Sequence, residues 1–160
     1  MKEINFSARY NEYTSKEELL PNDKDLMLLA IEARNRSYSP YSKFSVGAAV
    51  LLDNGEIVTG NNQENAAYPS GMCAERVAIW TASALYPDVK VIKLALSGMS
   101  RLKLVDTPVS PCGACRQVLS EYESKQGSEI QIFFTGEEGV VVETDSVRDL
   151  LPFSFDGSLV

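Results

Sequence analysis

The chain has 160 residues, a length that suits one domain able to bury a core without disulfides. Hydrophobic residues make up 44% and charged residues 23%, which is typical of a globular protein, and no apolar run is long enough to span a membrane. The net charge of −7 and the lack of clustered Lys and Arg argue against a nucleic-acid partner, because phosphate contacts need such clusters.

The first part of the chain, residues 1–23, is expected to be an extension. Positions 2–10 alternate between apolar and polar residues, which predicts a short added strand, and the polar stretch 11–21 suggests no role. This segment is too polar for a signal peptide, so we expect a cytoplasmic protein with reduced cysteines. A helix is predicted to begin at Asn22 and to end before Ser39-Pro40, since proline biases the preceding residue out of the helical region.

Strands and helices alternate along the rest of the chain. The first two strands are expected to form an antiparallel hairpin, and strands joined through helices to run parallel. We therefore predict an α/β fold, a three-layer α/β/α sandwich with a mixed five-stranded sheet, formed by residues 24–160. The expected strands are 44–52, 56–60, 89–97, 129–135 and 140–144, and the further helices are 73–85, 112–123 and 146–151.

All three cysteines lie where helices are predicted to begin. The spacing of Cys112 and Cys115 puts both sulfurs on one face of a helical turn, and Cys73 opens a helix of its own. Helix N-termini favour thiolates, and three thiolates without a fourth protein ligand would make an open zinc site. Glu75, two positions after Cys73, is a candidate proton carrier beside such a metal, or simply an acidic residue favoured by the helix dipole.

The cysteine spacing also fits three other interpretations. A Cys-x-x-Cys pair is typical of a redox couple, but such motifs usually have an aromatic residue before the first cysteine, and Cys73 and Glu75 would have no part in that chemistry. A structural zinc site requires four ligands, and the chain has no histidine and no fourth cysteine. The third alternative is a set of inert buried thiols.

Several motifs follow one another in a fixed order. They are SYSPYSKFSVGAA at 37–49, GNNQENAAY at 60–68, CAER at 73–76, SPCGACRQ at 110–117, and Leu150-Leu151-Pro152 with Phe155. In this combination the chain resembles the cytidine deaminase family, of the short-chain, three-cysteine, homotetrameric type. The similarity covers roughly residues 24–156 and does not extend over the first twenty-odd residues.

The resemblance implies a zinc-dependent hydrolase acting on a cyclic amidine C–N bond. It would convert free cytidine and deoxycytidine to uridine and deoxyuridine in pyrimidine salvage. One Zn²⁺ per chain would be bound by Cys73, Cys112 and Cys115, zinc-bound hydroxide would attack C4 of the base, and Glu75 would shuttle protons. Arg76 would donate a hydrogen bond to a cysteine sulfur, with Gln117 and Arg116 as weaker candidates; a surface ion pair is the other interpretation of Arg76.

The resemblance also implies a set of substrate-binding residues. Asn62 and Glu64 would hold the ribose hydroxyls, although turn formation and solvation are their ordinary roles. Because a carboxylate repels a phosphate, Glu64 favours a nucleoside over a nucleotide such as dCMP. Phe44 would pack on the pyrimidine or simply on the core. The full set of expected substrate-binding residues is Phe44, Asn62, Glu64, Ala66, Tyr68 and Phe155.

Several other functions compete with a cytidine deaminase. Blasticidin deaminase shares the cysteine motifs but is not expected to carry Asn62 and Glu64 in this form, and deaminases of guanine, dCMP and nucleic acids generally have a histidine where Cys73 stands. A zinc-stabilised binding module without activity is disfavoured by Glu75. The apolar helix 73–85 and the apolar C-terminal segment agree with a homotetramer in which Phe155 or Tyr68 reaches a neighbouring chain.

Overall fold

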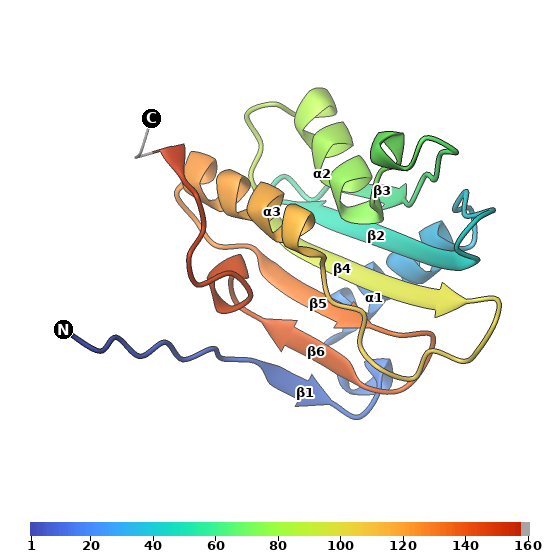
Figure 1. The fold of residues 1–160 in the computed structure, drawn as a ribbon, viewed down its shortest axis with the longest axis horizontal. Helices are drawn as coiled ribbons and strands as arrows, with labels where there is room; N and C mark the ends of the chain where they lie inside the picture. Colours follow the sequence, from blue (N-terminus) through green and yellow to red (C-terminus); the bar gives the residue numbers. More distant parts are fainter. Residues whose placement is uncertain (158–160) are drawn as a thin grey trace.

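The computed structural model describes residues 1–157 as a mixed sheet of six strands between helices (Figure 1). The strand order is β1-β6-β5-β4-β2-β3; β4 and β5 are parallel, and the other neighbours are antiparallel. None of the helices in these residues has the length and apolarity that crossing a membrane requires. The strands are β1 Asn11–Tyr13, β2 Phe44–Leu52, β3 Ile57–Asn61, β4 Val91–Ser100, β5 Gln131–Thr135 and β6 Val141–Thr144; the α-helices are α1 Pro21–Arg34, α2 Ala74–Leu85 and α3 Gly113–Gln126.

The two faces of the sheet pack on different helices, because successive side chains of a strand point to opposite faces. In β2, Ala48 and Val50 pack with α2 and α3 in one buried cluster, whereas Ala49 packs with α1 in another. Figure 1 shows α2 and α3 in front of the sheet and α1 behind it. This arrangement confirms the expected α/β/α layers and puts the cysteine-bearing helices on the same face.

Two glycines let the helices approach the sheet closely. A Cβ on Gly47 would lie 2.0 Å from the carbonyl oxygen of Ala30 in α1, and one on Gly60 would lie 2.5 Å from the backbone nitrogen of Ala78 in α2. Both distances are far below van der Waals contact, so only glycine allows these backbones to pack so closely. The glycine in β3 therefore determines how near α2, and the residues at its start, lie to the sheet.

The prediction of five strands was too low by one, because the extension adds β1 at the sheet edge. The strand was expected within 2–10, where the apolar side chains Ile4 and Phe6 alternate, but these are exposed and the strand lies at Asn11–Tyr13, paired with β6. Register with β6 and the bond from the Tyr13 hydroxyl to Glu143 place the strand there. The helix predicted over 146–151 is a single 3₁₀ turn, Val147–Asp149.

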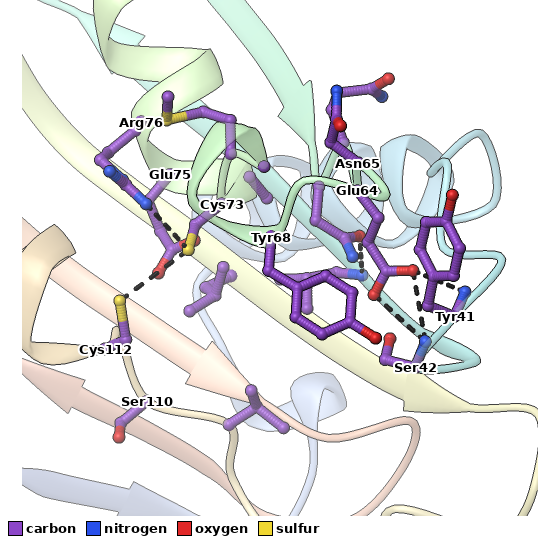
Figure 2. A pocket seen from close by; sticks show the side chains of 18 residues that line it. Tyr41, Ser42, Glu64, Asn65, Tyr68, Cys73, Glu75, Arg76, Ser110 and Cys112 are labelled. Carbon is purple, nitrogen blue, oxygen red and sulfur yellow. Dashed lines mark hydrogen bonds between the residues drawn. The ribbon is translucent and has the colours of Figure 1, made fainter.

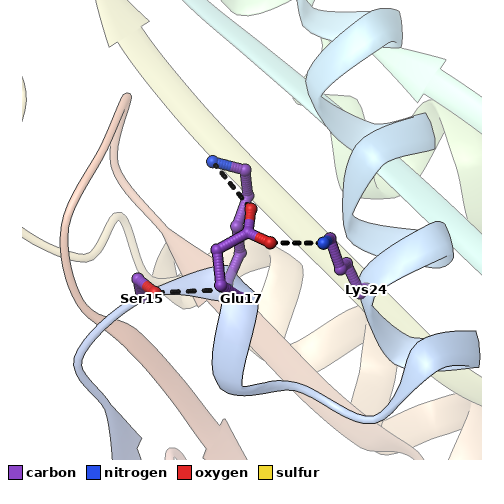
Figure 3. A network of polar contacts seen from close by, with 4 residues as sticks. Ser15, Glu17 and Lys24 are labelled. Atoms are coloured by element: carbon purple, nitrogen blue, oxygen red, sulfur yellow. Dashed lines mark hydrogen bonds and ion pairs between the residues drawn. The ribbon is translucent and has the colours of Figure 1, made fainter.

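A polar network joins the extension to α1 (Figure 3). Ser15 caps the 3₁₀ turn Lys16–Glu18 by accepting a bond of 3.2 Å from the backbone N–H of Glu17. The carboxylate of Glu17 forms an ion pair with Lys24 of α1. The polar stretch before α1 is thus ordered against the helix.

Candidate active site

The three cysteine sulfurs meet where α2 and α3 begin. Cys73 is the N-cap residue of α2, Cys112 is the N-cap residue of α3, and Cys115 lies in the first turn of α3. Both helices pack on the same face of the sheet, so their N-termini can converge. The Sγ atom of Cys112 lies 3.8 Å from that of Cys73 (Figure 2) and 3.5 Å from that of Cys115. All three sulfurs lie within 4.8 Å of one another.

This spacing fits a zinc ion. Tetrahedral Zn–S bonds of about 2.3 Å put neighbouring sulfurs about 3.8 Å apart, close to the separations observed here. Within residues 1–157 the cluster contains these three sulfurs and no fourth His, Cys, Asp or Glu ligand. The predicted ligand set of Cys73, Cys112 and Cys115 is therefore confirmed as a cluster able to hold a metal.

Electrostatics around the sulfurs favour a cation. A hydrogen bond from Cys115 and another from Arg76 lower the pKa of Cys73 to about 5. Donating to this thiolate, together with burial, raises the pKa of Cys115. Without a cation, the Cys73 thiolate therefore keeps the neighbouring Cys115 protonated, and a dication at the sulfurs would stabilise the thiolate form of its ligands.

Arg76, on the first turn of α2, donates from Nη2 to the Sγ atom of Cys73 over 3.4 Å. Its guanidinium also lies 5.9 Å from the centre of the Trp80 ring, one turn further along the helix. The Nε atom of Arg76 is buried without a partner among the described residues. These contacts put a fixed positive charge beside the sulfur cluster, which is the geometry that a hydrogen-bond donor to a metal ligand requires.

Glu75 lies beside the cluster with only 4% of its surface exposed. Burial raises the pKa of its carboxyl, and the negative charge of Cys73 adds to the effect. Glu75 also lines a cavity of about 710 Å³, a volume that suits a small molecule. Cys73, Cys112 and Arg76 line the same cavity, so the carboxyl and two of the sulfurs border one space.

Glu64 and Asn62 also line this cavity, and Figure 2 shows Glu64 well apart from Cys73 and Cys112. The Glu64 carboxylate accepts bonds from the backbone N–H groups of Tyr41 at 2.8 Å and Ser42 at 3.3 Å (Figure 2). Hydrogen bonding from Ser42 holds the pKa of Glu64 below its usual value. Asn62 bonds the β2 backbone, accepting from the N–H of Val46 and donating to a carbonyl oxygen. Each side chain keeps free hydrogen-bonding capacity for a ligand.

The expected substrate-binding residues do not all line the cavity of a single chain. Tyr68 does, and its ring contacts that of Tyr41 with centres 6.1 Å apart, while Phe44, Ala66 and Phe155 lie outside the lining. Gln117, expected near the sulfurs, instead bonds the backbone of Phe155 through both ends of its amide, donating over 2.7 Å and accepting over 3.3 Å. Gln117 thereby fixes the C-terminal segment on α3.

Arg116 also binds away from the sulfurs. Its guanidinium donates to the carbonyl oxygens of Pro111 at 2.7 Å and Leu150 at 2.9 Å, and to the Ser110 hydroxyl at 3.1 Å. These bonds hold the chain just before Cys112 against the start of α3. Arg116 therefore helps to place a ligand residue without contacting its sulfur.

Some residues of the cavity had not been singled out from the sequence. Tyr41 and Ser42 lie within the motif 37–49, whose position before a strand could have suggested them. Val109 and Ser110 precede the cysteine pair and line the wall next to Cys112. Val109 packs so closely on β4 that a Cβ at Gly98 would lie 2.8 Å from it, a contact that no local pattern reveals.

Comparisons with known proteins agree on one family. The family model for the cytidine and deoxycytidylate deaminase zinc-binding region matches residues 20–127. A cytidine deaminase of Sporosarcina psychrophila is 42% identical over 124 residues, 78% of this chain and 84% of the relative. That of Halalkalibacterium halodurans is 38% identical over 126 residues, 79% and 88% of the two chains.

A solved structure supports the same conclusion. The crystal structure of a cytidine deaminase from Burkholderia pseudomallei matches with a TM-score of 0.71 and 36% identity. The match covers 82% of this chain and 97% of the other. The similarity thus extends from the zinc-binding motifs to the whole fold, and the chain belongs to the cytidine deaminase family of zinc-binding enzymes.

Proposed function

We propose that this protein catalyses the hydrolytic deamination of free cytidine and deoxycytidine to uridine and deoxyuridine. The observation that carries the proposal is the meeting of three cysteine sulfurs, a buried carboxyl and a small-molecule cavity at one place. The names and coverage of the relatives support the same reaction. The reaction consumes one water and releases one ammonia, so it needs a nucleophile at C4 and a group that moves protons.

Cys73, Cys112 and Cys115 would hold one zinc ion per chain. When bound, zinc supplies Lewis acidity, which makes a water nucleophilic at neutral pH. Arg76 would stabilise the negative charge of the sulfurs through its bond to Cys73, as would the N-termini of the two helices.

Glu75 would be the proton carrier. Its carboxyl would accept one proton from the attacking water and deliver it to the ring nitrogen next to C4. It would then accept the remaining proton from the new hydroxyl on C4 and give it to the amino group, which departs as ammonia while the C4 carbonyl forms. Its burial, which raises the pKa of the carboxyl, and its place in the cavity wall support this role, because a proton carrier must hold a proton and reach the ligand. The chain has no histidine that could take over the role.

Glu64 and Asn62 would bind the ribose. Both line the same cavity as Cys73 and Cys112, and the separation of Glu64 from these cysteines in Figure 2 supports a place for the base between them. The ionised carboxylate of Glu64 suits a hydroxyl donor and repels a phosphate, which favours nucleosides over nucleotides. Phe44, Ala66, Tyr68 and Phe155 would complete the substrate site, with Phe155 or Tyr68 acting on a neighbouring chain.

We further propose that residues 24–160 form the deaminase domain, with 1–23 as its extension, and that four chains assemble with closed symmetry. Several large apolar side chains are exposed in a single chain, which supports burial against neighbours. They include Tyr68 at 76%, Phe155 at 60%, Leu85 at 63% and Trp80 at 42% exposure. Zinc-binding thiolates persist in a reducing compartment, which supports a cytoplasmic location. The net charge of −7 supports a free small-molecule substrate, without nucleic-acid or membrane partners.

Incubation with cytidine tests this function directly. We expect uridine and ammonia to form in equal amounts and faster than from dCMP under the same conditions. A protein that releases no ammonia from cytidine, while holding zinc and remaining folded, would instead be a zinc-stabilised binding module. Ammonia release from dCMP alone would contradict the nucleoside preference.

A further inference from the structure

The 38–43 loop, which joins α1 to β2, determines where the Glu64 carboxylate lies. Its Tyr41 and Ser42 N–H groups donate to that carboxylate. At the start of the loop, the backbone of Tyr38 pairs with the cavity wall, accepting a bond of 2.8 Å from the N–H of Glu64 and donating one of 3.0 Å to the carbonyl oxygen of Asn62. Any movement of the loop would therefore move Glu64.

Arg101, the residue that follows β4, binds this loop from the other side. Arg101 donates from Nη2 to the carbonyl oxygen of Ser39 at 2.5 Å and to its hydroxyl at 3.0 Å. The backbone N–H of Arg101 donates to the carbonyl oxygen of Lys43 at 2.9 Å. Arg101 thus binds the loop near both of its ends, through its side chain at Ser39 and through its backbone at Lys43.

The groups that Arg101 holds would be costly to leave unpaired. Ser39 is 2% exposed, and its hydroxyl also lies 3.1 Å from the buried hydroxyl of Ser45. Lys43 has a φ of 57°, a left-handed backbone conformation that residues other than glycine rarely adopt. Such a conformation persists only where surrounding contacts maintain it. The two bonds from the Arg101 guanidinium to Ser39 and the backbone bond to Lys43 help to maintain this loop conformation.

We propose that Arg101 is a positioning residue for nucleoside binding, which holds the 38–43 loop so that Tyr41 and Ser42 orient the Glu64 carboxylate towards the ribose. The inference rests on the proposed function, in which Glu64 binds the sugar. Arg101 itself does not line the cavity, so it acts through the loop and through its charge. That charge, after the hydrogen bonding from Ser42, helps to hold the pKa of Glu64 low.

Steady-state kinetics of Arg101→Gln with cytidine test the proposal, with Lys103→Gln as the matched control. Lys103 lies in the same segment and carries the same charge, but has no hydrogen bond or ion pair among residues 1–157. We expect Arg101→Gln to raise KM about tenfold and to change kcat less than about twofold, because the sulfurs and Glu75 are untouched. Lys103→Gln should leave both constants as they are.

Two further measurements separate positioning from a merely structural role. Amide hydrogen exchange at Tyr41 and Ser42 should be faster in Arg101→Gln and unchanged in Lys103→Gln. When Glu64→Gln is already present, adding Arg101→Gln should raise KM by less than about twofold more, since both changes act on one contact.

A normal KM in Arg101→Gln, or an equal rise in KM with and without Glu64→Gln, would overturn the proposal. A fall in kcat that matches the fraction of unfolded protein would assign Arg101 to stability alone. If the unmodified protein turns over cytidine and only these tests fail, the inference is wrong and the proposed function stands. If the unmodified protein neither binds nor deaminates cytidine, both are wrong.

Discussion

Replacing Gly60 by alanine should disturb the zinc site without touching a ligand. The new Cβ would lie 2.5 Å from the nitrogen of Ala78 and 2.6 Å from the carbonyl oxygen of Ala74, both backbone atoms of α2. Because backbone cannot rotate away, α2 would have to retreat by about 0.8–0.9 Å to restore an ordinary contact of 3.4 Å. Cys73 caps that helix and would move with it relative to the two cysteines of α3.

This displacement exceeds what a metal site tolerates. Ligand distances in zinc sites vary by only about 0.2 Å, so we expect Gly60→Ala to weaken zinc binding by about ten- to hundredfold. Overpacking should also lower the free energy of unfolding by about 1–3 kcal/mol. Competition with a chelator would measure zinc affinity, and urea unfolding of the metal-free protein would measure stability.

Gly113→Ala is the matched control, because Gly113 lies between two ligand cysteines yet a Cβ there meets nothing within 4 Å. We expect it to bind zinc as the unmodified protein does. If Gly60→Ala kept unchanged zinc affinity and stability, the close approach of α2 to β3 would not determine the geometry of the cluster. If both variants lost zinc equally, the effect would come from glycine replacement near the site and not from the packing.

Three further predictions concern single side chains. Glu75→Gln should still bind zinc and fold, but kcat for cytidine should fall by about four orders of magnitude, because an amide cannot carry protons. The control Glu138→Gln should leave kcat unchanged. A fall in kcat of less than about tenfold in Glu75→Gln would show that Glu75 does not carry the protons. Glu64→Gln should raise KM for cytidine about ten- to hundredfold and narrow the preference for cytidine over dCMP; unmodified protein that prefers dCMP would contradict the charge argument. Tyr13→Phe should lower the free energy of unfolding by about 1 kcal/mol, since it removes the hydroxyl bonded to Glu143. This bond raises the pKa of Tyr13 from 10.0 to about 12, so its contribution should be complete below pH 10 and lost between pH 10 and 12, a dependence that urea unfolding of Tyr13→Phe over that range should lack.

The sequence predicted best those elements whose signals are local. β2 begins at Phe44 and ends at Leu52 as expected, because a mostly apolar run is followed there by the turn residues Asp53-Asn54-Gly55. The cysteine spacing likewise indicated a shared metal site, since two ligands lie on one helical turn and the third opens another helix. Such features need no knowledge of distant contacts.

Features that depend on packing between distant segments were not predictable. The edge strand β1 is fixed by its register with β6, over 120 residues away, and its local alternation pointed to the wrong positions. The sequence offers Gln117 as a weaker candidate for a bond to a cysteine sulfur, but its amide bonds the backbone of Phe155, a contact that depends on the course of the C-terminal segment. The bonds that Arg101 makes to the 38–43 loop join residues 62 positions apart.

The central claim is that zinc held by the three cysteines supports deamination of cytidine. Metal-free protein titrated with Zn²⁺, with metal content and ammonia release measured on the same samples, tests it most directly. We predict that activity is absent without metal, rises in proportion to bound zinc and stops rising at one ion per chain, as the one three-cysteine cluster of residues 1–157 requires. Full ammonia release from protein that contains no metal would contradict the claim.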